Sequence, residues 1–144
     1  MLTLFEGPPG SGKSQSVQQA IADGELDVVA DFTSLWAAVR QVQRGPDGRY
    51  PIRRDDDPAL TMGYLTALQT AAVSIGLRRG MRVAVTSGTS GTAPKWAERA
   101  SVQGATFAVR TYDPGEAAVR ERLIDAETGE LAPECETAIR RWYK

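Results

Sequence analysis

The chain has 144 residues, with 17 basic against 18 acidic side chains, no histidine and one cysteine. This length suits one compact domain, and 42% apolar with 24% charged residues is typical of a soluble globular protein. The lack of histidine excludes Ser-His-Asp hydrolysis, histidine-based acid–base catalysis and zinc sites with histidine ligands. The net charge of −1 gives no overall electrostatic attraction that would favour non-specific DNA binding.

Short apolar runs alternate with segments of helical periodicity along the chain. The apolar runs predict strands at residues 2–5, 26–30, 81–86 and 106–111. Apolar residues at helical spacing predict helices at residues 13–22, 33–43, 60–75, 94–103, 116–126 and 133–143. The stretch 44–58 is rich in glycine and proline and predicts a loop. This alternation predicts an α/β fold, a short parallel sheet of about four strands with helices on both faces, in one domain spanning residues 1–144.

A phosphate-binding motif lies between the first predicted strand and the first predicted helix. Gly7-Pro8-Pro9-Gly10-Ser11-Gly12-Lys13-Ser14 has the pattern G-x-x-x-x-G-K-[ST] at every fixed position. Glycines let backbone N–H groups turn inward around a phosphate, and the following helix directs its positive end at the same anion. We expect Lys13 to reach the β- and γ-phosphates during catalysis and Ser14 to ligate Mg²⁺. The motif predicts binding of ATP or another nucleoside triphosphate.

Missing motifs narrow the class of nucleotide-binding protein. The chain has no apolar strand ending in Asp-Glu, as motors and helicases require, and no Asn-Lys-x-Asp guanine motif of Ras-type GTPases. The remaining layout is that of a small three-layer P-loop kinase, with an acid after the second strand and a lid-like segment at about residues 115–130.

The order of these parts resembles the kinase domain of phage polynucleotide 5′-kinases and their zeta-toxin-like and nucleoside-kinase-like relatives. The segment 28–31, Val-Val-Ala-Asp, is similar to the strand that ends in the family's catalytic aspartate. Residues 106–123 are similar to a strand, a turn (Thr-Tyr-Asp-Pro at 111–114) and an arginine-bearing lid helix. Many such kinases carry an acid after the third strand, where this chain has Thr86 and Ser87.

The resemblance implies catalytic roles for an aspartate and for lid arginines. Asp31 would orient the acceptor hydroxyl and accept its proton, or else cap the helix that follows it. Arg120 and Arg122 would clamp the transferring phosphoryl group. Alternatively, the two arginines form surface ion pairs with Glu116 and Asp125 on their own helix.

Two loops are further candidates for substrate contact. Thr86–Thr92 is rich in hydroxyl groups and follows the third strand, so it either contacts phosphate or forms a flexible loop. Arg53-Arg54-Asp55-Asp56-Asp57, together with Arg40, Arg44 and Arg49, either presents the phosphates of a nucleic-acid end or is a solvated charge run.

The sequence therefore predicts an ATP- and Mg²⁺-dependent protein that transfers a γ-phosphoryl group to a hydroxyl of a nucleotide or a polynucleotide end. One alternative is a phage-encoded nucleotide-binding accessory protein or weak ATPase, and another is a zeta-toxin-like kinase acting on a sugar nucleotide. With one cysteine, no signal peptide and no long apolar run, we expect no membrane segment and a cytoplasmic location, in the host cytoplasm for a phage-encoded protein.

Overall fold

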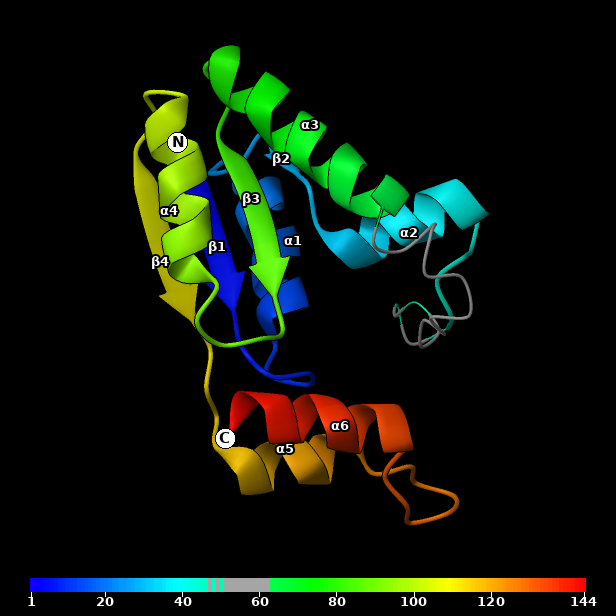
Figure 1. Cartoon of the computed structure of the whole chain (residues 1–144). Coiled ribbons are helices and arrows are strands. Elements are labelled where there is room, and N and C mark those ends of the chain that lie inside the picture. Colours follow the sequence, from blue (N-terminus) through cyan, green and yellow to red (C-terminus); the bar gives the residue numbers. More distant parts are fainter. Residues whose placement is uncertain (47, 49, 51–62) are drawn as a thin grey trace.

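A computed structural model describes residues 1–46, 48, 50 and 63–144. Four strands form one sheet, with helices on both of its faces (Figure 1). The strands are β1 (Leu2–Glu6), β2 (Val28–Val29), β3 (Val83–Ser87) and β4 (Phe107–Thr111). The helices are α1 (Lys13–Ala22), α2 (Phe32–Arg40), α3 (Thr66–Arg78), α4 (Ala93–Val102), α5 (Glu116–Leu123) and α6 (Pro133–Trp142).

The sheet is parallel throughout, in the order β2-β3-β1-β4. In the central strand β1, Glu6 pairs with Ser87 of β3 on one side and with Thr111 of β4 on the other. The carboxyl ends of three strands therefore meet at one edge, which is where open α/β sheets place their ligand sites. The predicted α/β architecture, with a parallel four-stranded sheet between helices, is confirmed.

The strands bury alternate side chains against different helices, as the two-residue period of a strand dictates. On one face, strand residues pack against α3 and α4 in a core of Leu2, Leu4, Val83, Val85, Val73, Leu77, Trp96 and Ala100. On the other face, strand residues pack against α1 in a smaller core of Phe5, Ala84, Val17, Ala20 and Leu26. Both layers meet at β1, so this strand holds the start of the following loop in a fixed position.

Several element ends differ from the sequence prediction. β2 has two residues instead of the five predicted, because Leu26 donates its N–H to Ala20 at the end of α1 and not to a neighbouring strand. α2 ends at Arg40 and not at residue 43, because Gln41 has a φ of 54° in the left-handed region, which stops a helix. β3 begins at Val83, two residues later than predicted, and includes Ser87.

The ends of two further helices also differ. α3 extends to Arg78, beyond the predicted end at residue 75, while its predicted start at residue 60 lies outside the described residues. α5 ends at Leu123 instead of residue 126, because Ile124 is extended and the Asp125 carboxylate accepts N–H groups in the turn that follows. Most of the predicted loop 44–58, including Arg49 and the charge run 53–57, is outside the described residues.

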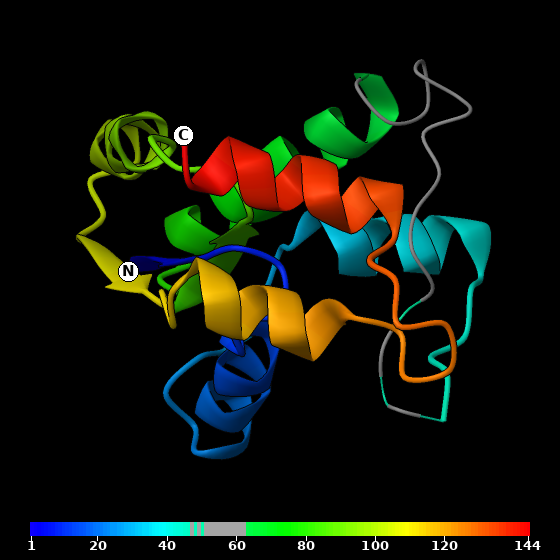
Figure 2. The ribbon, with the colours of Figure 1, turned by 90° about the horizontal axis from the view of Figure 1, so that it is seen from below.

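Helices α5 and α6 form a hairpin beyond the carboxyl ends of the strands (Figures 1 and 2). Val119 and Ile139 are fully buried, and Arg120 donates from Nη2 to Oε1 of Glu136 at 3.0 Å. The hairpin therefore has its own apolar contact and ion pair. In the described part of the chain, every helix is too short or too polar to cross a bilayer.

Candidate phosphate-binding site

The site is built around the glycine loop, Gly7–Gly12, which joins β1 to α1. Gly10 and Gly12 have φ values of 72° and 92°, a region that L side chains rarely adopt. Gly12 is the N-cap of α1, and no side chain caps the N–H groups of the first turn. A helix N-terminus without a side-chain cap leaves backbone donors for an anion.

Gly7 fixes the beginning of this loop between the ends of two strands. Its N–H donates to the carbonyl of Ser87 at 3.1 Å. A Cβ at this position would lie 2.4 Å from the carbonyl oxygen of Tyr112 and 2.6 Å from Oγ of Ser11. Only glycine fits such a close approach, so the loop begins at a position set by the sheet edge.

Lys13, the first residue of α1, places its ammonium inside the glycine loop. Nζ donates to the carbonyl oxygen of Pro8 at 3.1 Å. Burial lowers the pKa of Lys13 to about 8, and the negative charge of Asp31 opposes this shift. Among the described residues, no carboxylate lies within salt-bridge distance of this ammonium. The ammonium therefore bonds an uncharged carbonyl oxygen and feels the charge of Asp31 only at a distance.

A buried hydroxyl in the same loop lacks a partner. Ser11 is 8% exposed, and its Oγ has no hydrogen bond to any described residue. Oγ1 of Thr92, at the start of α4, is also buried and unpaired among the described residues. Buried polar groups of folded proteins are normally satisfied, and an ion or a water molecule commonly completes those that are not. The loop therefore fits a polar, anionic ligand.

Asp31 lies at the end of β2 and caps α2. Its Oδ1 accepts the N–H of Ser34 at 3.1 Å, and its backbone carbonyl accepts the N–H of Leu35 at 3.1 Å. The alternative role as an N-cap is thus observed. The same carboxylate acts electrostatically on Lys13, and within the described chain Oδ2 accepts no hydrogen bond. One oxygen is engaged by the helix while the other is available.

The two predicted lid arginines have different partners. Arg122 donates from Nη1 to the carbonyl oxygen of Gly10 at 3.1 Å, so it touches the glycine loop. Arg120 instead binds Glu136 and Glu116, and these carboxylates raise its pKa. The predicted pair of Arg120 with Glu116 is present. Arg122 does not pair with Asp125, whose Oδ1 accepts the N–H groups of the turn that follows it.

The hydroxyl-rich loop after β3 lies beside the glycine loop, as its place at the strand end predicts. The carbonyl of Ser87 accepts the Gly7 N–H, while the Ser87 hydroxyl donates to the carbonyl of Thr89 at 2.8 Å. Ser14 is in the first turn of α1 with an exposed side chain. The described residues contain no cluster of three or more acidic, cysteine or histidine side chains suited to a metal ion.

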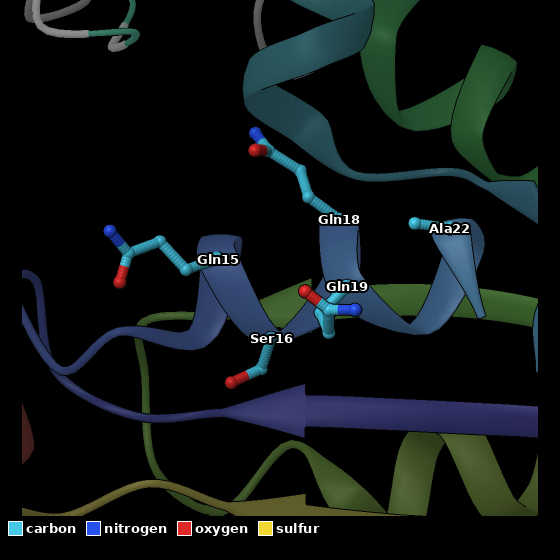
Figure 3. Close-up of a pocket in the computed structure, with 5 residues that line it drawn as sticks. All are labelled: Gln15, Ser16, Gln18, Gln19 and Ala22. Atoms are coloured by element: carbon cyan, nitrogen blue, oxygen red, sulfur yellow. The ribbon is translucent and has the colours of Figure 1, made fainter.

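A separate, shallow depression of about 630 Å³ lies on the outer face of α1 (Figure 3). It is lined by Gln15, Ser16, Gln18, Gln19 and Ala22. Lys13, Asp31 and Arg122 do not line this depression. Lys13 instead lies near enough to Asp31 to be affected by its charge, and Arg122 bonds Gly10, whereas Arg120 is bound within the hairpin.

The fold of this chain also occurs in solved structures. The chain is similar to a chain of the Pnkp1/Rnl/Hen1 RNA repair complex, with a TM-score of 0.70 and 15% sequence identity, covering 97% of this chain and 43% of that one. A second structure of the Pnkp1/Rnl/Hen1 complex gives a TM-score of 0.67 at 15% identity, covering 92% of this chain and 40% of that one. This chain therefore shares its fold with part of each of these two neighbours. This chain spans less than half the length of either neighbour, no family model matches it, and no curated protein matches its sequence.

The sequence reasoning missed one buried polar residue near the site. Gln69 of α3 donates from Nε2 to the carbonyl oxygen of Ala30 at 2.9 Å, directly before Asp31. The signal was a glutamine four residues after Leu65 and four before Val73, on the stripe that α3 buries. A polar residue on such a stripe indicates a buried hydrogen bond.

Proposed function

We propose that the chain binds a nucleoside triphosphate at Gly7–Ser14 and transfers its γ-phosphoryl group to a hydroxyl of a nucleotide or a polynucleotide end. The observation that carries the proposal is the partly buried Lys13 ammonium, which lies inside a glycine loop at an uncapped helix N-terminus. Such an ammonium is completed by an anion, and the loop N–H groups provide the matching donors.

Each part of the loop has a role in this reaction. Lys13 would leave the Pro8 carbonyl and neutralise the β- and γ-phosphates, and the uncapped N–H groups of α1 would hold the same oxygens. Mg²⁺, when bound, would neutralise further phosphate charge, with the exposed Ser14 hydroxyl as its protein ligand. Arg122 would move from the Gly10 carbonyl to the transferring group.

Asp31 would act on the acceptor. The acceptor oxygen forms a bond to the γ-phosphorus while the bond to the bridging oxygen breaks and the nucleoside diphosphate leaves. The hydroxyl proton passes to Oδ2 of Asp31, the oxygen that the helix cap leaves available. Thus the cap orients the carboxylate while its second oxygen serves the acceptor.

The fold supports a nucleic-acid end as acceptor. The neighbours whose fold this chain shares belong to an RNA repair complex, although the sequences are only 15% identical. We therefore test RNA and DNA 5′-hydroxyl ends first, followed by free nucleosides.

The experiment is transfer of label from γ-labelled ATP to oligonucleotides with 5′-hydroxyl ends, in parallel with a direct measurement of ATP binding. The proposal expects labelled oligonucleotide with the wild-type chain, none with Lys13→Ala, and much less with Asp31→Asn. ATP binding should be lost in Lys13→Ala and kept in Asp31→Asn. If ATP binds and no hydroxyl acceptor is labelled, the kinase proposal is wrong.

A second candidate is a nucleotide-binding protein that hydrolyses ATP slowly or not at all. The observation in its favour is that Thr86 and Ser87 end β3, so that strand brings no carboxylate to the site. In this case ATP binding, dependent on Lys13, occurs without labelled acceptor, and Asp31→Asn leaves the slow release of phosphate unchanged.

A further inference from the structure

Gln69 occupies a buried position on the otherwise apolar inner stripe of α3. The residue is 9% exposed, and Val73 on the next turn is 1% exposed. Burying a primary amide is unfavourable unless its polar atoms are hydrogen-bonded. Nε2 meets this need by donating to the carbonyl oxygen of Ala30 at 2.9 Å, across 39 residues of sequence.

Ala30 is fixed from two sides by this bond and by the sheet. Its N–H donates to the carbonyl of Ala84 in β3 at 2.8 Å, and its carbonyl accepts from Gln69. The carbonyl of Ala30 and the N–H of Asp31 belong to one planar peptide unit. Holding that carbonyl therefore fixes the peptide plane from which the Asp31 side chain starts.

We propose that Gln69 is a positioning residue that sets the Asp31 carboxylate opposite Lys13. This inference rests on the proposed function, in which Asp31 receives the acceptor proton. Two hydrogen bonds and one covalent constraint act in series. Gln69 holds the Ala30 carbonyl, and the planar peptide transmits this constraint to the backbone of Asp31. Oδ1 of Asp31 then caps α2 at Ser34. Oδ2 is not used by this cap and would receive the acceptor proton.

A role in apolar packing alone would not need a hydrogen-bond donor at this position. Leucine has a similar volume and would suit the apolar stripe, but it cannot bond the Ala30 carbonyl. Methionine keeps the length and the unbranched shape of glutamine, but its thioether donates no hydrogen bond. Both replacements remove the donor, and together they separate the hydrogen bond from the packing.

The experiment compares Gln69→Leu and Gln69→Met with the wild-type chain, with Val73→Ala as a matched control. Val73→Ala loosens the same stripe one turn away and keeps the hydrogen bond from Gln69 to the Ala30 carbonyl. Two quantities are measured: the split of phosphoryl transfer into kcat and KM for ATP, and the exchange rate of the Ser34 amide hydrogen, which Asp31 protects.

We expect both Gln69 variants to lower kcat at least tenfold with the KM for ATP within twofold, and to speed Ser34 exchange at least tenfold relative to amides in α1. Val73→Ala should leave kcat, and the rate of Ser34 exchange relative to amides in α1, close to their wild-type values. Wild-type kcat and unchanged Ser34 exchange in a folded Gln69 variant would overturn the inference. If the wild-type chain transfers no phosphoryl group, the proposed function fails, while Ser34 exchange alone still decides whether Gln69 positions Asp31.

Discussion

Arg122 and Gly10 connect the α5–α6 hairpin to the glycine loop, through a hydrogen bond of 3.1 Å from Nη1 to the carbonyl oxygen. Leu123 lies at the same place, with its Cγ 3.1 Å from the position a Cβ of Gly10 would occupy. The arginine therefore binds a backbone oxygen of the loop that we expect to hold phosphates. A bound triphosphate would offer it a stronger, charged partner.

Replacing Arg122 with alanine should therefore impair phosphoryl transfer without unfolding the hairpin. We expect kcat to fall by about tenfold or more, because a positioned arginine acts on charge that develops in the transition state. The melting temperature should stay close to the wild-type value, since Arg122 is exposed and bonds only one carbonyl among the described residues. Steady-state kinetics and thermal unfolding measure the two effects.

Arg120→Ala is the matched control, because Arg120 is two residues away on the same helix and binds Glu116 and Glu136. It should lower the melting temperature and leave kcat within about twofold. A loss of kcat in Arg120→Ala equal to that in Arg122→Ala would contradict the separation of roles, and would assign Arg120 to the nucleotide as well.

Lys13→Met should weaken nucleotide binding strongly and stabilise the folded chain. The lowered pKa, from 10.5 to about 8, means that burial disfavours the charged ammonium. At about 1.4 kcal/mol for each pKa unit, removing the charge should stabilise the fold by about 2–4 kcal/mol. ATP affinity should fall by about 100-fold or more, since charge-assisted bonds to phosphate are lost. Titration calorimetry and denaturant unfolding test both parts.

Nucleotide affinity should depend on pH through the same lysine. In the free protein Lys13 loses its proton as the pH rises through about 8, so ATP binding should weaken above that value. The folded pKa is below the unfolded one, and the folded chain binds fewer protons between these values. The contribution of Lys13 to stability therefore rises with pH from about 8 to 10.5. Binding and unfolding curves from pH 6 to 10, compared with Lys13→Met, isolate this contribution; equal pH slopes would contradict it.

Gly7→Ala should be strongly destabilising, because the new Cβ would lie 2.4 Å from the backbone oxygen of Tyr112. Neither the loop nor β4 can move without breaking sheet pairing, so we expect a loss of about 2–4 kcal/mol of unfolding free energy. Gly88→Ala is the control, since a Cβ there meets no atom within 4 Å and the φ is not positive. Denaturant unfolding of both variants measures the two free energies of unfolding. Similar losses in Gly7→Ala and Gly88→Ala would contradict the close contact at Gly7.

Local signals predicted some elements well. The helix α1 was predicted with the same bounds that the structure has, Lys13–Ala22, because glycines mark both its start and its stop. The length of β2 was not predictable in this way. A strand ends where its neighbour stops pairing, and the ladder between β2 and β3 covers Val28 and Val29. Strand ends therefore depend on a partner that is distant in sequence.

The features of the candidate site also differ in how well the sequence predicts them. Asp31 as a cap and the glycine loop follow from adjacent residues, so the sequence pattern indicates both. The contact of Arg122 with Gly10 spans 112 residues, and the bond from Gln69 to Ala30 spans 39. Such contacts require the folded topology, because nothing in the neighbouring residues specifies the partner.

The ion pair between Arg120 and Glu136 should make the hairpin sensitive to acid. Hydrogen bonds from Arg120 and Arg140 lower the pKa of Glu136 from 4.5 to about 2. The stabilisation is therefore complete above the unfolded pKa of 4.5 and is lost as the pH falls through about 2. In Glu136→Gln, α6 amide protection should change less between pH 4.5 and 2 than in the wild-type chain. Glu134→Gln, on the same turn, should keep the wild-type slope, and equal slopes in all three proteins would exclude Glu136 as the source of the acid sensitivity.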